Sequence, residues 1–207
     1  MKRAAVFIDG FNLYHGLKAA ADNHLKWCNL WQLSEDIIPS KSQELVEVHF
    51  STAFVPNDNE KTIRHRAYNR ALTLVRVKIH EGTFVNDRRR CPSCAHEWKI
   101  WAEKQSDINI ALALMDAAYR DVFDHCYLMT TDSDHAATVT WLRAKFPGKE
   151  LTIVVPPNKE RSKLIEAWAG GAIIRLERAN IERALFDEVV TGEGGSIKRP
   201  RAYAPPN

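Results

Sequence analysis

The stretch that decides the fold is Ala-Ala-Val-Phe-Ile-Asp-Gly at residues 4–10. An unbroken apolar run that stops at an Asp-Gly turn signal is typical of a short strand buried on both faces of a sheet. Further strands are expected, by the same signals, at residues 45–55, 78–85, 127–131, 151–155 and 172–176. Helical patterns separate these runs, which predicts an α/β fold with a mostly parallel central sheet and helices on both faces.

Helices are expected at residues 12–21, 30–38, 60–75, from 106 onward, and at 135–146, 161–168 and 180–186. The helix that begins near Ser106 is amphipathic, because Ile108, Leu112 and Met115 fall on one side of it at helical spacing. In open parallel sheets, ligands bind where the carboxyl ends of the strands meet. Polar residues at strand ends are therefore the first candidates for a site.

The composition is that of a globular chain with a core, since 45% of its 207 residues are apolar and 27% are charged. No apolar run approaches the roughly 20 residues that span a bilayer, and the first run is too short for a signal peptide. A cytoplasmic protein without a membrane partner is expected. Residues 1–187 are predicted to form one domain with a hairpin insertion at about 86–103, followed by an extended, basic Gly/Pro-rich tail at 188–207.

Four aspartates stand at strand ends or helix starts. Asp9 closes the first strand, Asp132 and Asp134 follow the strand at 127–131, and Asp107 lies in the first turn of the helix near Ser106. Each has a plain structural interpretation, as a turn residue or a helix cap, but four together are harder to explain in that way.

Crowded carboxylates repel one another unless a cation lies among them, and hard oxygen ligands suit Mg²⁺ or Mn²⁺. The set therefore suggests metal-dependent phosphoryl chemistry. Asp116, nine residues after Asp107, is half a turn out of phase with it on an α-helix and is excluded.

Three motifs resemble the NYN domain family of the PIN-like nuclease group. They are Phe-Ile-Asp-Gly-Phe-Asn-Leu-Tyr at 7–14, Glu-Lys-Gln-Ser-Asp-Ile-Asn-Ile-Ala at 103–111 and Thr-Asp-Ser-Asp at 131–134. The resemblance implies a PIN-like three-layer sandwich and a metal-dependent endoribonuclease that acts on RNA. It also implies that the metal-site acids are Asp9, Asp107, Asp132 and Asp134.

By the same resemblance, Asn12 is a polar support or substrate contact, and Ser133 adds a hydroxyl or backbone contact. The sequence departs from the family where Thr131 replaces a common Gly and where His135 replaces a common aromatic residue. His135 is expected on the surface at a helix start, with contact to substrate as the alternative. An RNA-binding or scaffold module with weak or lost catalysis is the alternative function.

Two enzyme classes are disfavoured by the residues after the first strand. An aspartyl-phosphate phosphatase commonly has a second Asp at the position of Phe11, and a dinucleotide-binding enzyme would show Gly-x-Gly-x-x-Gly there.

The net charge of +3 permits a polyanionic partner without requiring one. Lys159, Arg161 and Lys163 follow a strand that should end on the same edge as Asp132, so they are predicted to contact the RNA backbone. The run at residues 88–90, three consecutive arginines, extends this track on the insertion.

The insertion also contains Cys91-Pro-Ser-Cys94, a spacing that holds zinc as thiolates. A structural zinc needs four ligands, so His96, His80 or Cys28 would have to join the pair, or a second chain would complete the site in a homodimer. A turn with free thiols is the alternative. Trp98 and Trp101 are expected to pack the hairpin onto the domain rather than to stack on bases.

Overall fold

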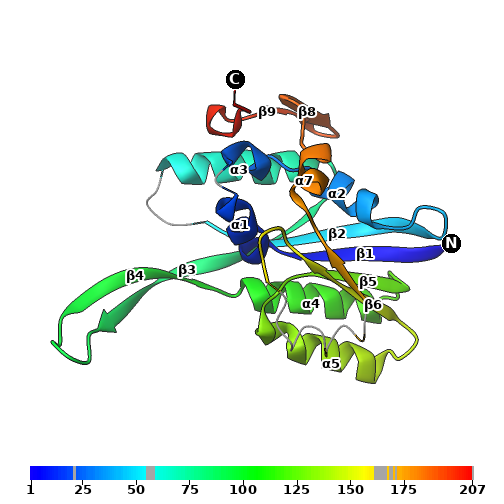
Figure 1. Cartoon of the computed structure of the whole chain (residues 1–207), viewed down its shortest axis with the longest axis horizontal. Coiled ribbons are helices and arrows are strands. Elements are labelled where there is room, and N and C mark those ends of the chain that lie inside the picture. The colour runs from blue at the N-terminus through cyan, green and yellow to red at the C-terminus, as the bar shows by residue number, and fades with distance from the viewer. Residues whose placement is uncertain (21, 55–58, 161–166, 168–169, 171, 207) are drawn as a thin grey trace.

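The computed structural model of the chain describes residues 1–20, 22–54, 59–160, 167, 170 and 172–206 (Figure 1). Seven strands form one sheet in the order β4-β3-β2-β1-β5-β6-β7. Every neighbouring pair in it is parallel except β3 with β4, which confirms the mostly parallel sheet. The strands are β1 (Lys2–Asp9), β2 (Gln43–Ala53), β3 (Lys78–Arg90), β4 (Glu97–Lys104), β5 (His125–Met129), β6 (Glu150–Val155) and β7 (Ile173–Arg175).

Helices cover both faces of the sheet and give the expected three-layer sandwich (Figure 1). On one face lie α1 (Gly10–Ala19), α2 (Leu30–Ile37), α3 (Asn59–Leu74) and α7 (Arg178–Arg183), and on the other lie α4 (Ser106–Tyr119) and α5 (Ala136–Lys145). The central strand β1 serves both layers, because Val6 and Ile8 join one apolar cluster while Ala5 and Phe7 join the other. This explains why its sequence is an unbroken apolar run.

The buried face of α4 differs from the expected stripe. Ile108 and Leu112 are 62% and 57% exposed, whereas Ile110 and Leu114 are buried in the core beneath α4, which lies over β1, β2 and β3. The buried face includes three alanines, at 113, 117 and 118, whose small side chains let the helix approach the sheet closely. The large residues of the other side remain in solvent.

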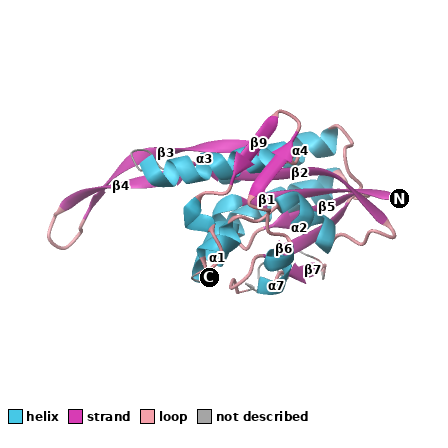
Figure 2. Cartoon of the chain, turned by 90° about the horizontal axis from the view of Figure 1, so that it is seen from above, coloured by secondary structure: helices cyan, strands magenta, loops and turns pink. Residues whose placement is uncertain are grey.

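The segment at 78–104 forms a long two-stranded arm. Beyond Gly82, strand β3 leaves β2 and pairs with β4 in antiparallel register, from Thr83 opposite Lys104 to Arg90 opposite Glu97. This arm projects far beyond the rest of the protein in both views (Figures 1 and 2). The expectation that its tryptophans pack on the domain is wrong, because Trp98 and Trp101 are 43% and 40% exposed.

The segment after residue 187 is folded rather than an extended tail. A hairpin of β8 (Val189–Gly192) and β9 (Gly195–Lys198) lies along α3, where Arg70 donates a hydrogen bond to the carbonyl oxygen of Gly194. A following 3₁₀ turn, η3 (Arg201–Tyr203), places Tyr203 on Trp27 with ring centroids 6.2 Å apart. Burial of apolar side chains in this segment explains the difference from the expectation, which rested on its Gly/Pro content alone.

No helix in the described part of the chain is long and apolar enough to cross a lipid bilayer.

Candidate metal centre

Asp9 is fixed at the carboxyl end of β1, in the middle of the sheet. It caps α1, because its Oδ1 accepts a hydrogen bond of 3.0 Å from the Asn12 backbone N–H. Its Oδ2 accepts a bond of 3.0 Å from the hydroxyl of Thr130, which follows β5. The residue is only 2% exposed. Each oxygen retains a free lone pair, so the carboxylate is both immobilised and available to a ligand.

The next residue, Gly10, must be glycine because the backbone of α1 approaches strand β2 closely at this point. A turn conformation is not the reason. A Cβ atom at this position would lie 2.0 Å from the Ser51 carbonyl oxygen of β2 and 2.7 Å from the Phe50 ring. The first turn of α1 therefore rests directly on the neighbouring strand, which fixes the direction in which α1 leaves Asp9.

Asp107 approaches the same edge of the sheet from α4. Gln105 adopts a left-handed conformation, with φ of 80°, where the chain turns from β4 into the helix. The Glu103 side chain then accepts a bond of 2.9 Å from the Ser106 backbone N–H. Asp107 follows in the first helical turn, where the helix dipole favours a carboxylate.

His135 is buried, contrary to the expectation of a surface position. It ends the 3₁₀ turn η2 (Ser133–His135), and it is 1% exposed rather than on the surface. Its Nε2 lies 3.8 Å from Oδ1 of Asp107, too far for a hydrogen bond, and has no hydrogen-bond partner among the described residues. A buried ring nitrogen without a partner requires an explanation, since desolvation of an unsatisfied polar atom is costly.

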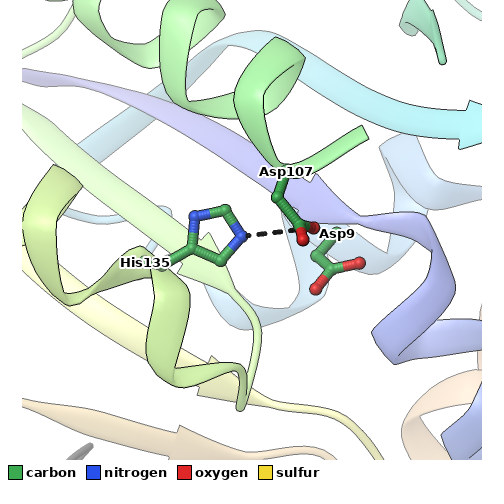
Figure 3. Close-up of side chains that lie close together, drawn as sticks. All are labelled: Asp9, Asp107 and His135. Atoms are coloured by element: carbon green, nitrogen blue, oxygen red, sulfur yellow. Dashed lines mark ion pairs between the residues drawn. The ribbon is translucent and has the colours of Figure 1, made fainter. Parts of the chain in front are cut away.

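The three side chains face one another (Figure 3). One carboxylate oxygen of Asp9, one of Asp107 and a ring nitrogen of His135 all lie within 4.8 Å of one another. Ligands bound at about 2.0–2.2 Å from one cation are separated by up to twice that distance, so small adjustments would let the three atoms share an ion.

Burial disfavours the charged form of each group. It raises the pKa of the Asp107 carboxyl to about 6, and the nearby charges of Asp9 and Asp132 add to the effect. Burial also raises the pKa of Asp9, although its two hydrogen bonds oppose the shift. It lowers the pKa of His135, so the imidazole is neutral near pH 7 and the contact with Asp107 is not an ion pair.

The donor set fits a divalent cation on these observations. A neutral imidazole offers a lone pair, and a cation would remove the repulsion that raises the pKa of Asp107. The same cation would satisfy the buried Nε2 atom of His135. Asp9, Asp107 and His135 are the residues that would hold it.

Asp132 and Asp134 lie beside this group and are not members of it. Asp132 is half-buried, and its Oδ1 accepts a bond of 3.0 Å from the Asp134 backbone N–H, so it caps η2. Asp134 and Ser133 are exposed. Both acids are close enough for their charges to raise the pKa of Asp107. Two of the four expected acids therefore contact the candidate ion position, and two surround it with negative charge.

Asn12 connects α1 to the turn that follows β5. Its Oδ1 accepts bonds of 3.1 Å from the backbone N–H and 3.0 Å from the hydroxyl of Thr131. The Thr131 side chain therefore has a defined role, although the sequence comparison leads one to expect Gly at this position. The contact holds the segment that contains Asp132 in register with Asp9.

Of the expected phosphate contacts, Lys159 is half-buried and lies close enough to His15 for its charge to lower the pKa of that residue. Arg161 and Lys163 lie outside the described residues, and so does most of the helix expected at 161–168. The three arginines at 88–90 lie on the β3 side of the arm, near its tip.

Cys91 and Cys94 occupy the tip of the arm with free thiols. The backbone N–H groups of Cys94 and Ser93 bond the Cys91 sulfur and hold the pKa of this thiol below its ordinary value. His80, a proposed third ligand, is at the base of β3, where its ring instead contacts His49 at 2.9 Å. Cys28 is buried in the main core.

The fold and the site define an α/β protein of the PIN-like nuclease group with a candidate metal centre at the carboxyl edge of its sheet. The family model described as NYN domain matches residues 3–170, and the chain belongs to that family. This confirms the family that the three motifs indicate.

Two further comparisons place the chain among known proteins. It is 23% identical over 241 residues to 6-hydroxy-3-succinoylpyridine 3-monooxygenase HspA of Pseudomonas putida (strain DSM 28022 / S16). The aligned region covers 99% of this chain and 76% of that protein. A crystal structure of a protein of unknown function from Vibrio parahaemolyticus RIMD 2210633 superposes with a TM-score of 0.53. It is 15% identical and covers 86% of this chain and 94% of that one, so the likeness concerns the fold alone.

Proposed function

We propose that the protein is a metal-dependent endoribonuclease that hydrolyses phosphodiester bonds in RNA. The observation that carries this proposal is the buried Nε2 of His135, which faces the carboxylates of Asp9 and Asp107 without a hydrogen-bond partner in the described structure. Membership of the NYN domain family supports the nuclease class. The choice of RNA as the substrate is part of the proposal and goes beyond family membership.

Each residue has a definite task in this proposal. Asp9, Asp107 and His135 hold the cation, while the two outer acids, Asp132 and Asp134, face the approaching water and orient it. A bound divalent cation supplies an acidified water and neutralises charge on the phosphate. Asn12 keeps the two halves of the site in register through Thr131. Ser133, exposed beside them, contacts the substrate.

The imidazole of His135 affects which metal ion the site prefers. Carboxylates and water suit Mg²⁺ and Mn²⁺ alike, but a nitrogen ligand shifts the preference away from Mg²⁺ towards first-row transition ions. Of the two cations expected from the acids, Mn²⁺ is therefore proposed as the better activator.

A site made of acids repels a polyanion, so affinity for RNA must come from cations around it. Lys159 follows the carboxyl end of β6, and the arginines at residues 88–90 on the arm extend the track. Arg161 and Lys163 complete the proposed contact set.

The direct test is cleavage of a panel of RNA and DNA oligonucleotides by the purified protein with Mn²⁺, Mg²⁺ or chelator. Asp9→Asn should abolish RNA cleavage, since loss of several kcal/mol of transition-state stabilisation corresponds to a rate loss of about 10²-fold or more. Asp116→Asn is the matched control, because Asp116 is exposed on the far side of α4 and bonds to Arg120 at 2.7 Å. RNA binding without cleavage in the wild type would favour the RNA-binding module instead.

A second candidate function is hydroxylation of a small heteroaromatic acid, the activity named for the relative from Pseudomonas putida. A cavity of about 350 Å³ between α1, α3 and η3 favours it. Aromatic side chains of Phe50, Tyr68 and Tyr203 line this cavity together with the cations Lys26 and Arg64. Oxygen uptake on addition of a hydroxypyridine carboxylate and a reduced nicotinamide cofactor, unaffected by added RNA, would support this function over cleavage.

A further inference from the structure

The tip of the β3–β4 arm carries two cysteines with free thiols in one turn. Cys91 and Cys94 are separated by two residues in a tight turn, closed by bonds of 2.9 Å from the Cys91 N–H to the His96 carbonyl and from the Ala95 N–H to the Cys91 carbonyl. Ala95 adopts a left-handed conformation, with φ of 58°. Zinc binds cysteine sulfur as thiolate, and two cysteines at this spacing in one turn supply two of its ligands.

The described residues do not complete this site by themselves. Structural zinc takes four ligands in a tetrahedron. All of residues 78–104 are described, and no third Cys, His, Asp or Glu among the described residues joins the two sulfurs at ligand distance. The His96 ring stacks on Trp98 instead, with ring centroids 6.1 Å apart.

We propose that Cys91 and Cys94 of two copies of this chain bind one zinc ion at the joined tips of their arms and so make a zinc-clasped homodimer. The partner contributes the same two ligands by two-fold symmetry, which completes the tetrahedron with four thiolates. The projection of the arm beyond the domain keeps the two bodies apart when the tips meet (Figures 1 and 2).

The surface next to the tip suits a second copy. The register of β3 and β4 places Val85, Trp98 and Ile100 on one face of the arm, and they are 42%, 43% and 37% exposed. These exposed apolar side chains share the face with Asp87 and Arg89, lead up to the two cysteines and offer a contact surface to a second copy.

The charges are complementary as well. Zinc with four thiolates has a net charge of about −2. Each copy brings the arginines at residues 88–90 beside it, and of these Arg89 forms an ion pair with Asp87 at 3.0 Å.

The test uses the full chain, purified under reducing conditions with zinc and without tags. Native mass spectrometry and light scattering should find a dimer with about one zinc ion per two chains. A chelator, or the double change Cys91→Ser with Cys94→Ser, should give zinc-free monomers with the melting temperature of the domain unchanged. His96→Ala is the matched control and should keep both zinc and dimer.

A second measurement uses the wild-type protein and therefore does not depend on the folding of the variants. Replacement of zinc by Co²⁺ in the wild type should give the intense thiolate-to-cobalt absorption of a four-sulfur site, and the band should grow in proportion to the dimer fraction. One zinc ion per monomer, a dimer that persists in the double variant, or reduced protein without zinc would each overturn the clasp. The Asp9→Asn protein should still dimerise, so failure of the clasp and failure of the nuclease proposal are distinguishable.

Discussion

The Nε2 atom of His135 and the Oδ1 atom of Asp107 face each other across 3.8 Å, held by two helical segments on either side of the strand that ends at Asp9. This separation is too long for a hydrogen bond and suits two ligands of one ion. Because neither atom depends on the other for its position, both remain available to bind a metal ion between them. Most of the expected behaviour of the site follows from this arrangement.

Replacement of His135 by Asn should change the metal preference. Loss of the ring nitrogen should weaken Mn²⁺ binding at least about tenfold, while Mg²⁺, which prefers oxygen, should lose less. Isothermal titration calorimetry with each ion measures both affinities. Ser133→Ala, in the same turn but exposed, is the control. Equal losses for the two ions would show that His135 is not a ligand.

The stability of the metal-free protein should depend on Asp107. Its folded pKa of about 6 is above the ordinary value of 3.8, so the folded state binds more protons between these values. Its contribution to the free energy of unfolding is therefore full below about pH 4 and is lost as pH rises through 6. Urea unfolding in chelator across this range should show the decline, and Asp107→Asn should flatten it. Added Mn²⁺ should restore stability most above pH 6, and a wild-type profile that matches the variant's would contradict the shift.

Asn12→Ala should lower the rate of cleavage without removing the metal. The change breaks both bonds from Thr131 and frees the segment that contains Asp132. Losses of about 10–100-fold are usual when a group that positions a metal site is removed. Thr131→Val breaks only the hydroxyl bond and should cost less. Single-turnover kinetics at saturating Mn²⁺ measures the effect, and a wild-type rate in Asn12→Ala would exclude this role.

Gly10→Ala should destabilise the fold. The added Cβ would meet the Ser51 carbonyl oxygen at 2.0 Å, and neither backbone can move far. Overpacking of this kind costs about 1–3 kcal/mol or more. Gly148→Ala is the matched control, since a Cβ at Gly148 would meet nothing within 4 Å. The midpoint of urea unfolding separates the two, and equal midpoints would be inconsistent with the packing described.

Lys159→Ala should reduce the salt dependence of RNA binding. Each lost phosphate contact lowers the slope of log affinity against log salt by about 0.7 for single strands. Lys41, exposed in the turn before β2 at the opposite edge of the sheet, gives the control variant Lys41→Ala. Fluorescence anisotropy in an Asp9→Asn background avoids cleavage during the titration. An unchanged slope in Lys159→Ala would move the binding track to the arm.

The fold was predictable because its signals are local. The apolar run before Asp9 and the helix start at Ser106 appear in the structure as expected. The position of His135 was not predictable, because its burial depends on how η2 packs beneath α4. No local sequence pattern encodes this packing. The spacing of three residues between Asp132 and His135 places both in one turn but does not predict that His135 is buried.

The remaining differences have one physical origin. Trp98, Ile108 and Leu112 are large and apolar, and the sequence analysis therefore expected them to pack on the domain. Whether an apolar side chain is buried depends on the space opposite it. On α4 the alanines occupy the close contact with the sheet, and the outer part of the arm projects away from the described part of the domain (Figure 2).

The pairing of β1 with β5 has a kinetic consequence. The bond between the Thr130 hydroxyl and Asp9 joins residues 121 positions apart in the chain. Closure of so long a loop is entropically unfavourable and slow relative to local structure, so hairpins and helices can form well before it. The candidate centre therefore does not exist in any partly folded chain in which β5 has not docked. During synthesis, the candidate centre cannot form before residue 135 has been made.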